Sequence, residues 1–215
     1  DKLLILSPKY HKILENINQS PGNVFIYSEY RNLEGLAVLS KVLNANGYVE
    51  FKIKKNAGKW ELDIDDMSKP KYIRWGTQGD MDSVLLKIYN NQWENISTIL
   101  SDDLIDYLSQ NNNLRGDIAK ILMTTKTGAE GITLKNVRQV NILEPYWNYG
   151  RLEQVKGRAI RAKSHIDLEE DERNVSIYTY LSVFGDKVFA EKETTDEYLY
   201  NMSLKKKDII EQLFN

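Results

Sequence analysis

Residues 118–161 read IAKILMTTKTGAEGITLKNVRQVNILEPYWNYGRLEQVKGRAIR, and this stretch decides which fold the chain can adopt. Its apolar runs at 118–124 and 137–143 predict two buried strands, and the glycine-containing segment 127–131 predicts a loop between them. After Glu144-Pro145 the apolar period becomes that of a helix, over residues 148–161. A strand, a loop, a second strand and a closing helix are typical of a parallel sheet covered by helices.

The predicted helix 148–161 carries a polar stripe. At about 100° per residue, Gln154, Arg158 and Arg161 fall on one side of it, with Gly157 beside them. The guanidinium group presents a fixed fork of donors that suits phosphate oxygens and stays charged at any working pH. We therefore interpret the stripe as a candidate phosphate site, with an ordinary solvated helix face as the alternative.

The rest of the chain continues this alternation of strands and helices. Apolar patterns predict strands at 23–28, 72–75 and 175–181, and helices at 9–18, 32–46, 81–89, 102–109 and 194–214. Alternating residues at 48–53 and 60–64 around Asn56-Ala57-Gly58 predict a β-hairpin insertion, at about 48–71. The predicted fold class is α/β, a parallel sheet with helices on both faces plus this small hairpin. In such folds, ligands bind beyond the carboxyl ends of the strands, where Ser28, Thr77 and Thr125 are expected.

Composition limits the chemistry that the chain can support. It has 215 residues, a formal net charge of −2 and no cysteine, which excludes disulfides and thiolate catalysis and fits a reducing compartment. His11 and His165 are the only histidines and lie far apart in the sequence, so no metal site is predicted. No apolar run is long enough to span a membrane, and any contact with nucleic acid must be a local groove.

Four segments resemble motifs of the second RecA-like domain of superfamily 2 helicases. QVKGRAIR at 154–161 resembles the sixth motif, Q-x-x-G-R-x-x-R; TTKTGAEGITL at 124–134 resembles the fifth; VFIYSEY at 24–30 resembles the fourth. YIRWGT at 72–77 resembles the strand that follows the fourth motif. Flanking segments such as SPKYHKILENI and TTDEYLYNMSLKKKDII are similar to helicases of large nucleocytoplasmic DNA viruses, which include the Swi/Snf-like poxvirus phosphohydrolase and early-transcription-factor types.

The resemblance assigns nucleotide-binding roles. It implies that Arg161 acts as the arginine finger on ATP, that Arg158 supports it, and that Gln154 orients the phosphate or the attacking water. It also implies nucleotide contacts by the residues around the fifth-motif loop and beside the arginines: Gly131, Glu130, Gly128, Thr133 and Gly157. The glycines have alternatives, a plain turn for Gly128 and Gly131 and helix packing for Gly157. Glu130 is expected either to pair with Arg158 or Arg161 or to remain an exposed carboxylate.

The resemblance also assigns a nucleic-acid groove. Ser28, Thr125 and Thr77 would hydrogen-bond the phosphates of a DNA or RNA strand, and Trp147 would stack on a base. The alternatives are hydroxyl groups that cap the strand ends, and burial of Trp147 beneath the helix. For His165 a structural role is the expected one.

The 215 residues contain no G-x-x-x-x-G-K-[ST] phosphate loop and no strand that ends in an Asp-Glu box. In the resembled family these belong to an N-terminal RecA-like domain, which would hold most of the ATP and Mg2+ and is expected to be a partner of this chain. The chain, a domain over 1–215 with a C-terminal helix at about 194–215, is then expected to be inactive in isolation. RNA polymerase or transcription factors are further partners that the resemblance suggests, in the cytoplasmic viral factory or the virion.

Two functions remain open from the sequence. The first is the C-terminal half of an ATP-dependent helicase or translocase, and the second is a catalytically inert RecA-like module that docks on viral transcription machinery. The joint presence of Gln154, Arg158 and Arg161 favours the first, because docking does not need them. A nucleotide-binding α/β enzyme acting alone is disfavoured by the missing phosphate loop.

Overall fold

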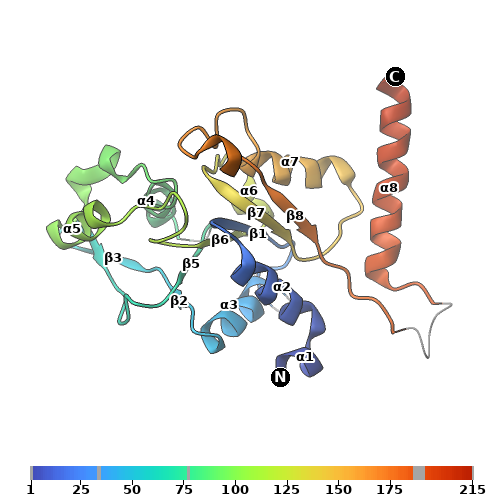
Figure 1. Cartoon of the computed structure of the whole chain (residues 1–215), viewed down its shortest axis with the longest axis horizontal. Helices are drawn as coiled ribbons and strands as arrows, with labels where there is room; N and C mark the ends of the chain where they lie inside the picture. The colour runs from blue at the N-terminus through green and yellow to red at the C-terminus, as the bar shows by residue number, and fades with distance from the viewer. Residues whose placement is uncertain (1, 33–34, 77, 186–191, 215) are drawn as a thin grey trace.

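A six-stranded parallel sheet forms the centre of the molecule, in the order β2-β5-β6-β1-β7-β8 (Figure 1). The computed structural model describes residues 2–32, 35–76, 78–185 and 192–214. The sheet strands are β1 (Asn23–Tyr27), β2 (Val49–Glu50), β5 (Lys71–Arg74), β6 (Ile121–Thr124), β7 (Val137–Ile142) and β8 (Ser176–Thr179). The parallel α/β sheet predicted from the sequence is therefore confirmed.

Helices cover both faces of this sheet (Figure 1). The helices are α1 (Lys2–Leu6), α2 (Pro8–Gln19), α3 (Leu36–Ala45), α4 (Asp80–Tyr89), α5 (Asp102–Gln110), α6 (Lys126–Ala129), α7 (Tyr149–Ala159) and α8 (Thr195–Phe214), with 3-10 turns at Trp93–Ile99 and Glu170–Glu172. A two-stranded antiparallel hairpin, β3 (Ile53–Asn56) and β4 (Lys59–Leu62), lies apart from the main sheet.

The central strand β1 is buried on both sides, and its side chains alternate between two apolar cores. Val24 and Ile26 pack with α2 and α3, whereas Phe25 and Tyr27 pack with α4, α5 and α7. Successive side chains of a strand point to opposite faces, so the continuous run NVFIY can serve both layers.

Local signals set the helix ends. The Ser7 side chain caps α2 by accepting a hydrogen bond from the Tyr10 amide, with Pro8 at the first helical position. Thr194 and Glu197 form a reciprocal capping box at α8: the Glu197 amide donates to Thr194 Oγ1 (3.1 Å) and the Thr194 amide donates to Glu197 Oε2 (2.8 Å). The acidic start of this helix therefore has a capping role.

Three details of the sequence-based prediction are wrong. Val49 and Glu50 do not belong to the hairpin, because they pair with β5 in the main sheet. The segment 127–131 is not wholly a loop, since Lys126–Ala129 forms one helical turn. The helix expected at 148–161 ends at Ala159, because Ile160 leaves helical geometry (φ −117°, ψ 48°).

Candidate nucleotide site

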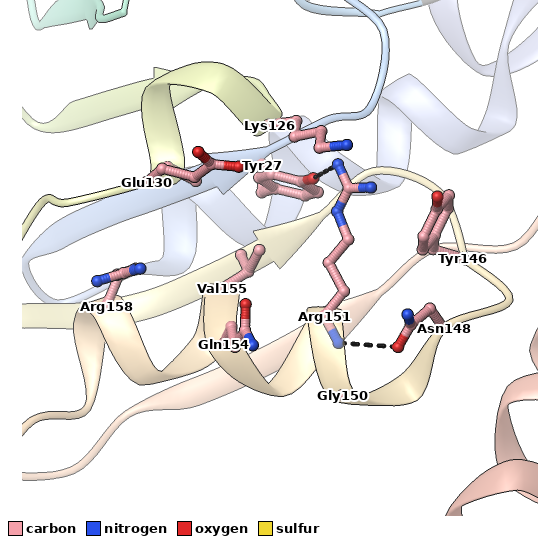
Figure 2. A pocket seen from close by; sticks show the side chains of 11 residues that line it. Tyr27, Lys126, Glu130, Tyr146, Asn148, Gly150, Arg151, Gln154, Val155 and Arg158 are labelled. Carbon is pink, nitrogen blue, oxygen red and sulfur yellow. Dashed lines mark hydrogen bonds between the residues drawn. The ribbon is translucent and has the colours of Figure 1, made fainter.

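A cavity of about 470 Å³ opens at the carboxyl ends of β1, β6 and β7 (Figure 2). It is lined by Tyr27 from β1, by Lys126, Ala129 and Glu130 from α6 and the loop after it, and by Tyr146, Asn148, Gly150, Arg151, Gln154, Val155 and Arg158 from α7 and the loop before it. Its charged lining consists of three basic side chains and one acidic side chain, Lys126, Arg151, Arg158 and Glu130. Such a lining favours an anionic ligand.

Helix α7 places three of these polar side chains. Asn148 caps the helix through a hydrogen bond that the Arg151 amide donates to Asn148 Oδ1 (3.2 Å). Leu152, Val155 and Ala159 are buried against the sheet. Arg151, Gln154 and Arg158 are therefore left on the side that faces the cavity, where Figure 2 shows them one after another along the helix.

Arg151 is the most strongly held of the cavity's basic residues, and sequence reasoning missed it. Its Nη2 donates to Glu29 Oε2 (3.0 Å) and to the Tyr27 hydroxyl (3.2 Å), and the Tyr27 hydroxyl donates to Glu29 Oε1 (2.5 Å). The guanidinium also lies 4.6 Å from the centre of the Tyr146 ring. Burial, followed by the hydrogen bond and charge of Glu29, raises the pKa of Tyr27, so this hydroxyl stays protonated. The available signal was the i, i+3 spacing of Arg151 and Gln154 on one helix face.

Arg161 does not share the stripe of Gln154 and Arg158. It lies beyond the end of α7 and is exposed, and its Nη1 donates to Thr133 Oγ1 (2.6 Å). The predicted single stripe is therefore corrected: Gln154 and Arg158 line the cavity, whereas Arg161 reaches the loop before β7. That loop is tied to α7 because the Leu134 amide donates to the Arg158 carbonyl (3.0 Å).

Glycine occupies positions 128, 131 and 157, in the segments 124–134 and 154–161, and the structure gives a separate account of each position. Gly131 has a φ of +83°, a conformation that favours glycine. Gly128 is buried, and a Cβ there would collide with the Thr124 hydroxyl, so close packing explains it. A Cβ on Gly157 would meet nothing within 4 Å, so the helix-packing alternative does not apply within the described chain. Glu130 has no ion pair among the described side chains, and it remains an exposed carboxylate on the cavity wall.

The residues expected to contact nucleic acid differ in their exposure to solvent. Ser28 is fully buried, and its hydroxyl donates to Glu144 Oε1 (2.7 Å). Thr125 is partly exposed in a second cavity, of about 170 Å³, which Arg31, Asn32 and Arg74 also line. The predicted Thr77 contact lies outside the described residues. Sequence reasoning missed Arg31 and Arg74, which stand beside the expected phosphate contact.

Trp147 is neither buried nor free. Its side chain is 42% exposed, and Lys206 of α8 lies with its Nζ 3.9 Å from the ring centre. This cation–π contact occupies one face of the indole ring. Base stacking on that face of Trp147 would require Lys206 to move away.

His165 has a structural role, as the sequence analysis expected. Its ring nitrogens lie 2.6 Å from the Val137 carbonyl and 2.8 Å from Ser164 Oγ, which fixes the segment after α7. Across the described parts of the chain, there is no group of three or more His, Cys, Asp and Glu that could hold a metal ion. The described helices include none with the length and hydropathy needed to cross a membrane.

Comparison with known proteins gives the relationships of the chain. Residues 99–163 match the family model "Helicase conserved C-terminal domain". A protein of African swine fever virus named as a termination factor NPH-I homolog is 36% identical over 93% of this chain and 30% of its own length. A protein of Acanthamoeba polyphaga mimivirus named as an ATP-dependent RNA helicase is 31% identical over 86% of this chain and 27% of its own. The chain thus spans about 30% of the length of these curated relatives.

The fold has a counterpart among solved structures. The C-terminal part of the Fun30 ATPase domain superposes with a TM-score of 0.55 at 16% identity, over 91% of this chain and 44% of that one. The family match agrees with this similarity of fold. The chain therefore carries a match to the helicase conserved C-terminal domain over residues 99–163, has an α/β RecA-like fold, and is similar to proteins of African swine fever virus and mimivirus that are named as a termination factor homolog and a helicase.

Proposed function

We propose that this chain is the second RecA-like domain of an ATP-dependent helicase or translocase that works on a nucleic-acid strand. The observation that carries the proposal is the basic cavity at the carboxyl ends of the strands, where Arg158 and Gln154 share one wall. Arginine forks suit phosphate oxygens, and a positively charged wall stabilises the charge that develops during phosphoryl transfer. The termination-factor name of one relative supports a role in viral transcription.

The side chains present fit a polyphosphate but not its metal ion. Lys126, Arg151 and Arg158 supply cationic donors, while the described residues offer no acidic cluster for Mg2+. We therefore expect a preceding RecA-like domain of the same longer protein to hold most of the ATP and the Mg2+. The length of the relatives supports this expectation, because the African swine fever virus protein and the mimivirus protein each have more than two thirds of their sequence outside the part that matches this chain.

Two cavity residues, Arg158 and Gln154, and two residues outside the cavity, Arg161 and Gly157, then have definite tasks. Arg158 would bind the terminal phosphate oxygens of a nucleotide held between the two domains, and Gln154 would orient the phosphate or the attacking water. Arg161 is proposed to leave Thr133 and act as the arginine finger, since its exposed side chain is held by a single hydrogen bond. The open face at Gly157 would allow the other domain to approach closely.

The experiment is the substitution Arg158→Ala in the full-length protein. Nucleic-acid-stimulated ATP hydrolysis is expected to fall by about 10³-fold, the magnitude typical for loss of a charge-stabilising arginine. Arg115→Ala is the matched control, because Arg115 is exposed, pairs with Glu172 and does not line the cavity. Unchanged hydrolysis in Arg158→Ala would reject the proposal that this domain completes the ATPase site, and a wild-type protein that hydrolyses no ATP would favour the inert docking module.

A further inference from the structure

Ser28 and Tyr27 are consecutive residues of one strand end, yet their side chains lie in different sites. The Tyr27 side chain lines the basic cavity, whereas the Ser28 side chain is buried against Glu144 at the end of β7. Glu29 follows them and contacts both sides. Its carboxylate accepts hydrogen bonds from Arg151 and Tyr27, and its backbone amide donates to Glu144 Oε1. A short chain of contacts thus connects the cavity to Ser28.

The cavity end of this chain is an ion pair that a ligand can compete for. The side chains of Arg151 and Glu29 are only 16% and 15% exposed. Only Nη2 of the guanidinium has hydrogen-bond partners among the described residues, so Nη1 and Nε remain as donors next to the cavity. An anion in the cavity can therefore bind Arg151 and draw it away from Glu29.

The other end of the chain explains how Ser28 is kept from solvent. Ser28 is 0% exposed, and its hydroxyl accepts from the Tyr30 amide (3.1 Å) while donating to Glu144. Glu144 holds the Ser28 hydroxyl and the Glu29 amide on the same oxygen. In this arrangement no strand phosphate can reach Ser28. If Ser28 contacts nucleic acid, Glu144 must first release it.

We propose that Glu29 is a positioning residue that couples the two sites: it holds Arg151 while the cavity is empty, and it keeps Ser28 covered until an anion draws Arg151 away. Loss of Arg151 would leave the Glu29 carboxylate buried and without its cationic partner, which is unfavourable. The carboxylate then turns towards solvent, the Glu29 amide leaves Glu144, and Ser28 becomes available. This inference rests on the proposed function, because it assumes a nucleotide phosphate as the anion and a strand phosphate as the partner of Ser28.

The test is a coupling measurement on the full-length protein. Single-strand affinity is measured with and without a non-hydrolysable ATP analogue, in the wild type and in Glu29→Gln. In the wild type the analogue is expected to tighten strand binding by roughly 5- to 150-fold, the usual range of coupling between sites. In Glu29→Gln, Arg151 is no longer held by a charge, so strand binding without the analogue should already be tight. The coupling ratio, which is the strand affinity with the analogue divided by the strand affinity without it, should then fall to within about twofold of one.

Two further variants keep the result interpretable. Glu172→Gln is the matched control, because Glu172 also pairs with an arginine, Arg115, but lies on no cavity described above, and its ratio should equal that of the wild type. Arg151→Gln removes the other partner and should also abolish the ratio, so it serves if Glu29→Gln does not fold. In the double variant the two effects should not add.

The outcomes separate this inference from the proposed function. If Glu29→Gln and Arg151→Gln both keep the coupling ratio of the wild-type protein, the coupling role of Glu29 is overturned, even if Arg158→Ala has lost hydrolysis. If Arg158→Ala retains full hydrolysis, the proposed function itself is rejected and this inference with it. Loss of the ratio in both variants, with Glu172→Gln unchanged, supports the coupling.

Discussion

Glu144 illustrates how burial changes a single carboxyl group. It is 9% exposed, and burial raises its pKa above the ordinary value of 4.5 even though Ser28 and the Glu29 amide donate hydrogen bonds to it. The charge of Lys9 acts in the opposite direction and lowers the pKa of Glu144; both side chains line a further cavity, of about 680 Å³, together with Asp196. A carboxyl group whose pKa is higher in the folded state binds its proton more tightly there than in the unfolded chain.

The sign of the resulting pH dependence follows directly. The protonated form stabilises the fold fully below about pH 4.5, and this contribution is lost as the pH rises through the higher folded-state pKa. The free energy of unfolding of the wild type relative to Glu144→Gln should therefore be largest in acid and decline towards neutral pH. Urea denaturation at several pH values measures this difference. A difference that does not change with pH would contradict the burial argument.

Arg151 shows what sequence reasoning could and could not find among the site residues. Gln154 and Arg158 were predicted because their spacing and type match a recognisable motif, and both line the cavity. Arg151 was missed because its partners, Glu29 and Tyr27, lie more than 120 positions away in the chain. Arg161 was placed on the helix because periodicity alone does not reveal the break at Ile160.

At the scale of elements, Gly128 in α6 and Gly157 in α7 should respond in opposite ways to substitution by alanine. Gly128→Ala places a methyl group against the Thr124 hydroxyl and the Trp75 ring, so unfolding should become easier by about 1–3 kcal/mol. Gly157→Ala meets no atom within 4 Å in a helix interior, so stability should rise by about 0.5–1 kcal/mol. Urea denaturation of the 215-residue chain measures both changes.

The same Gly157→Ala variant also tests the proposed approach of a second domain. In the full-length protein, an added methyl group at a closely approached face should lower ATP hydrolysis although the domain itself is more stable. Unaltered hydrolysis in a stabilised Gly157→Ala protein would show that this face stays open. Loss of stability in Gly157→Ala would instead contradict the packing described for α7.

The elements themselves were predictable where one physical signal dominated. The burial of β1 on both faces followed from its unbroken apolar run, and α2 from its Ser-Pro start. The hairpin was assigned too widely because residues 48–53 alternate in polarity like an edge strand, whereas Val49 and Glu50 pair with β5 in the sheet. Alternation does not specify which neighbour a strand pairs with, since that depends on tertiary contacts.

At the scale of the whole molecule, charge is distributed so that binding must be local. The net charge is −2, yet the walls of two cavities contain Lys126, Arg151 and Arg158, and Arg31 and Arg74. The 215-residue chain should therefore bind single strands weakly through few phosphate contacts. Each contact on a single strand contributes about −0.7 to the slope of log affinity against log salt, so a slope of about −2 or shallower is expected.

Titration of a fluorescent single strand at several salt concentrations gives this slope. A salt-independent interaction would indicate docking rather than phosphate binding. The same preparation should hydrolyse no ATP above background, because the phosphate loop is missing from these residues. Robust hydrolysis by the 215-residue chain would contradict the two-domain proposal.

The side-by-side placement of Tyr27 and Ser28 limits how this protein can change in evolution. Neighbouring side chains of a strand face opposite ways. Inserting or deleting one residue within β1 would therefore exchange the orientations of the Tyr27 and Ser28 side chains, and would damage both the basic cavity and the Ser28–Glu144 contact. A mutation that alters the length of the chain is tolerable only outside this strand, in segments such as the tip of the hairpin at Asn56–Lys59, which lies apart from both cavities. Relatives of this chain should accordingly differ in length at the hairpin and keep a constant number of residues from Asn23 to Glu29.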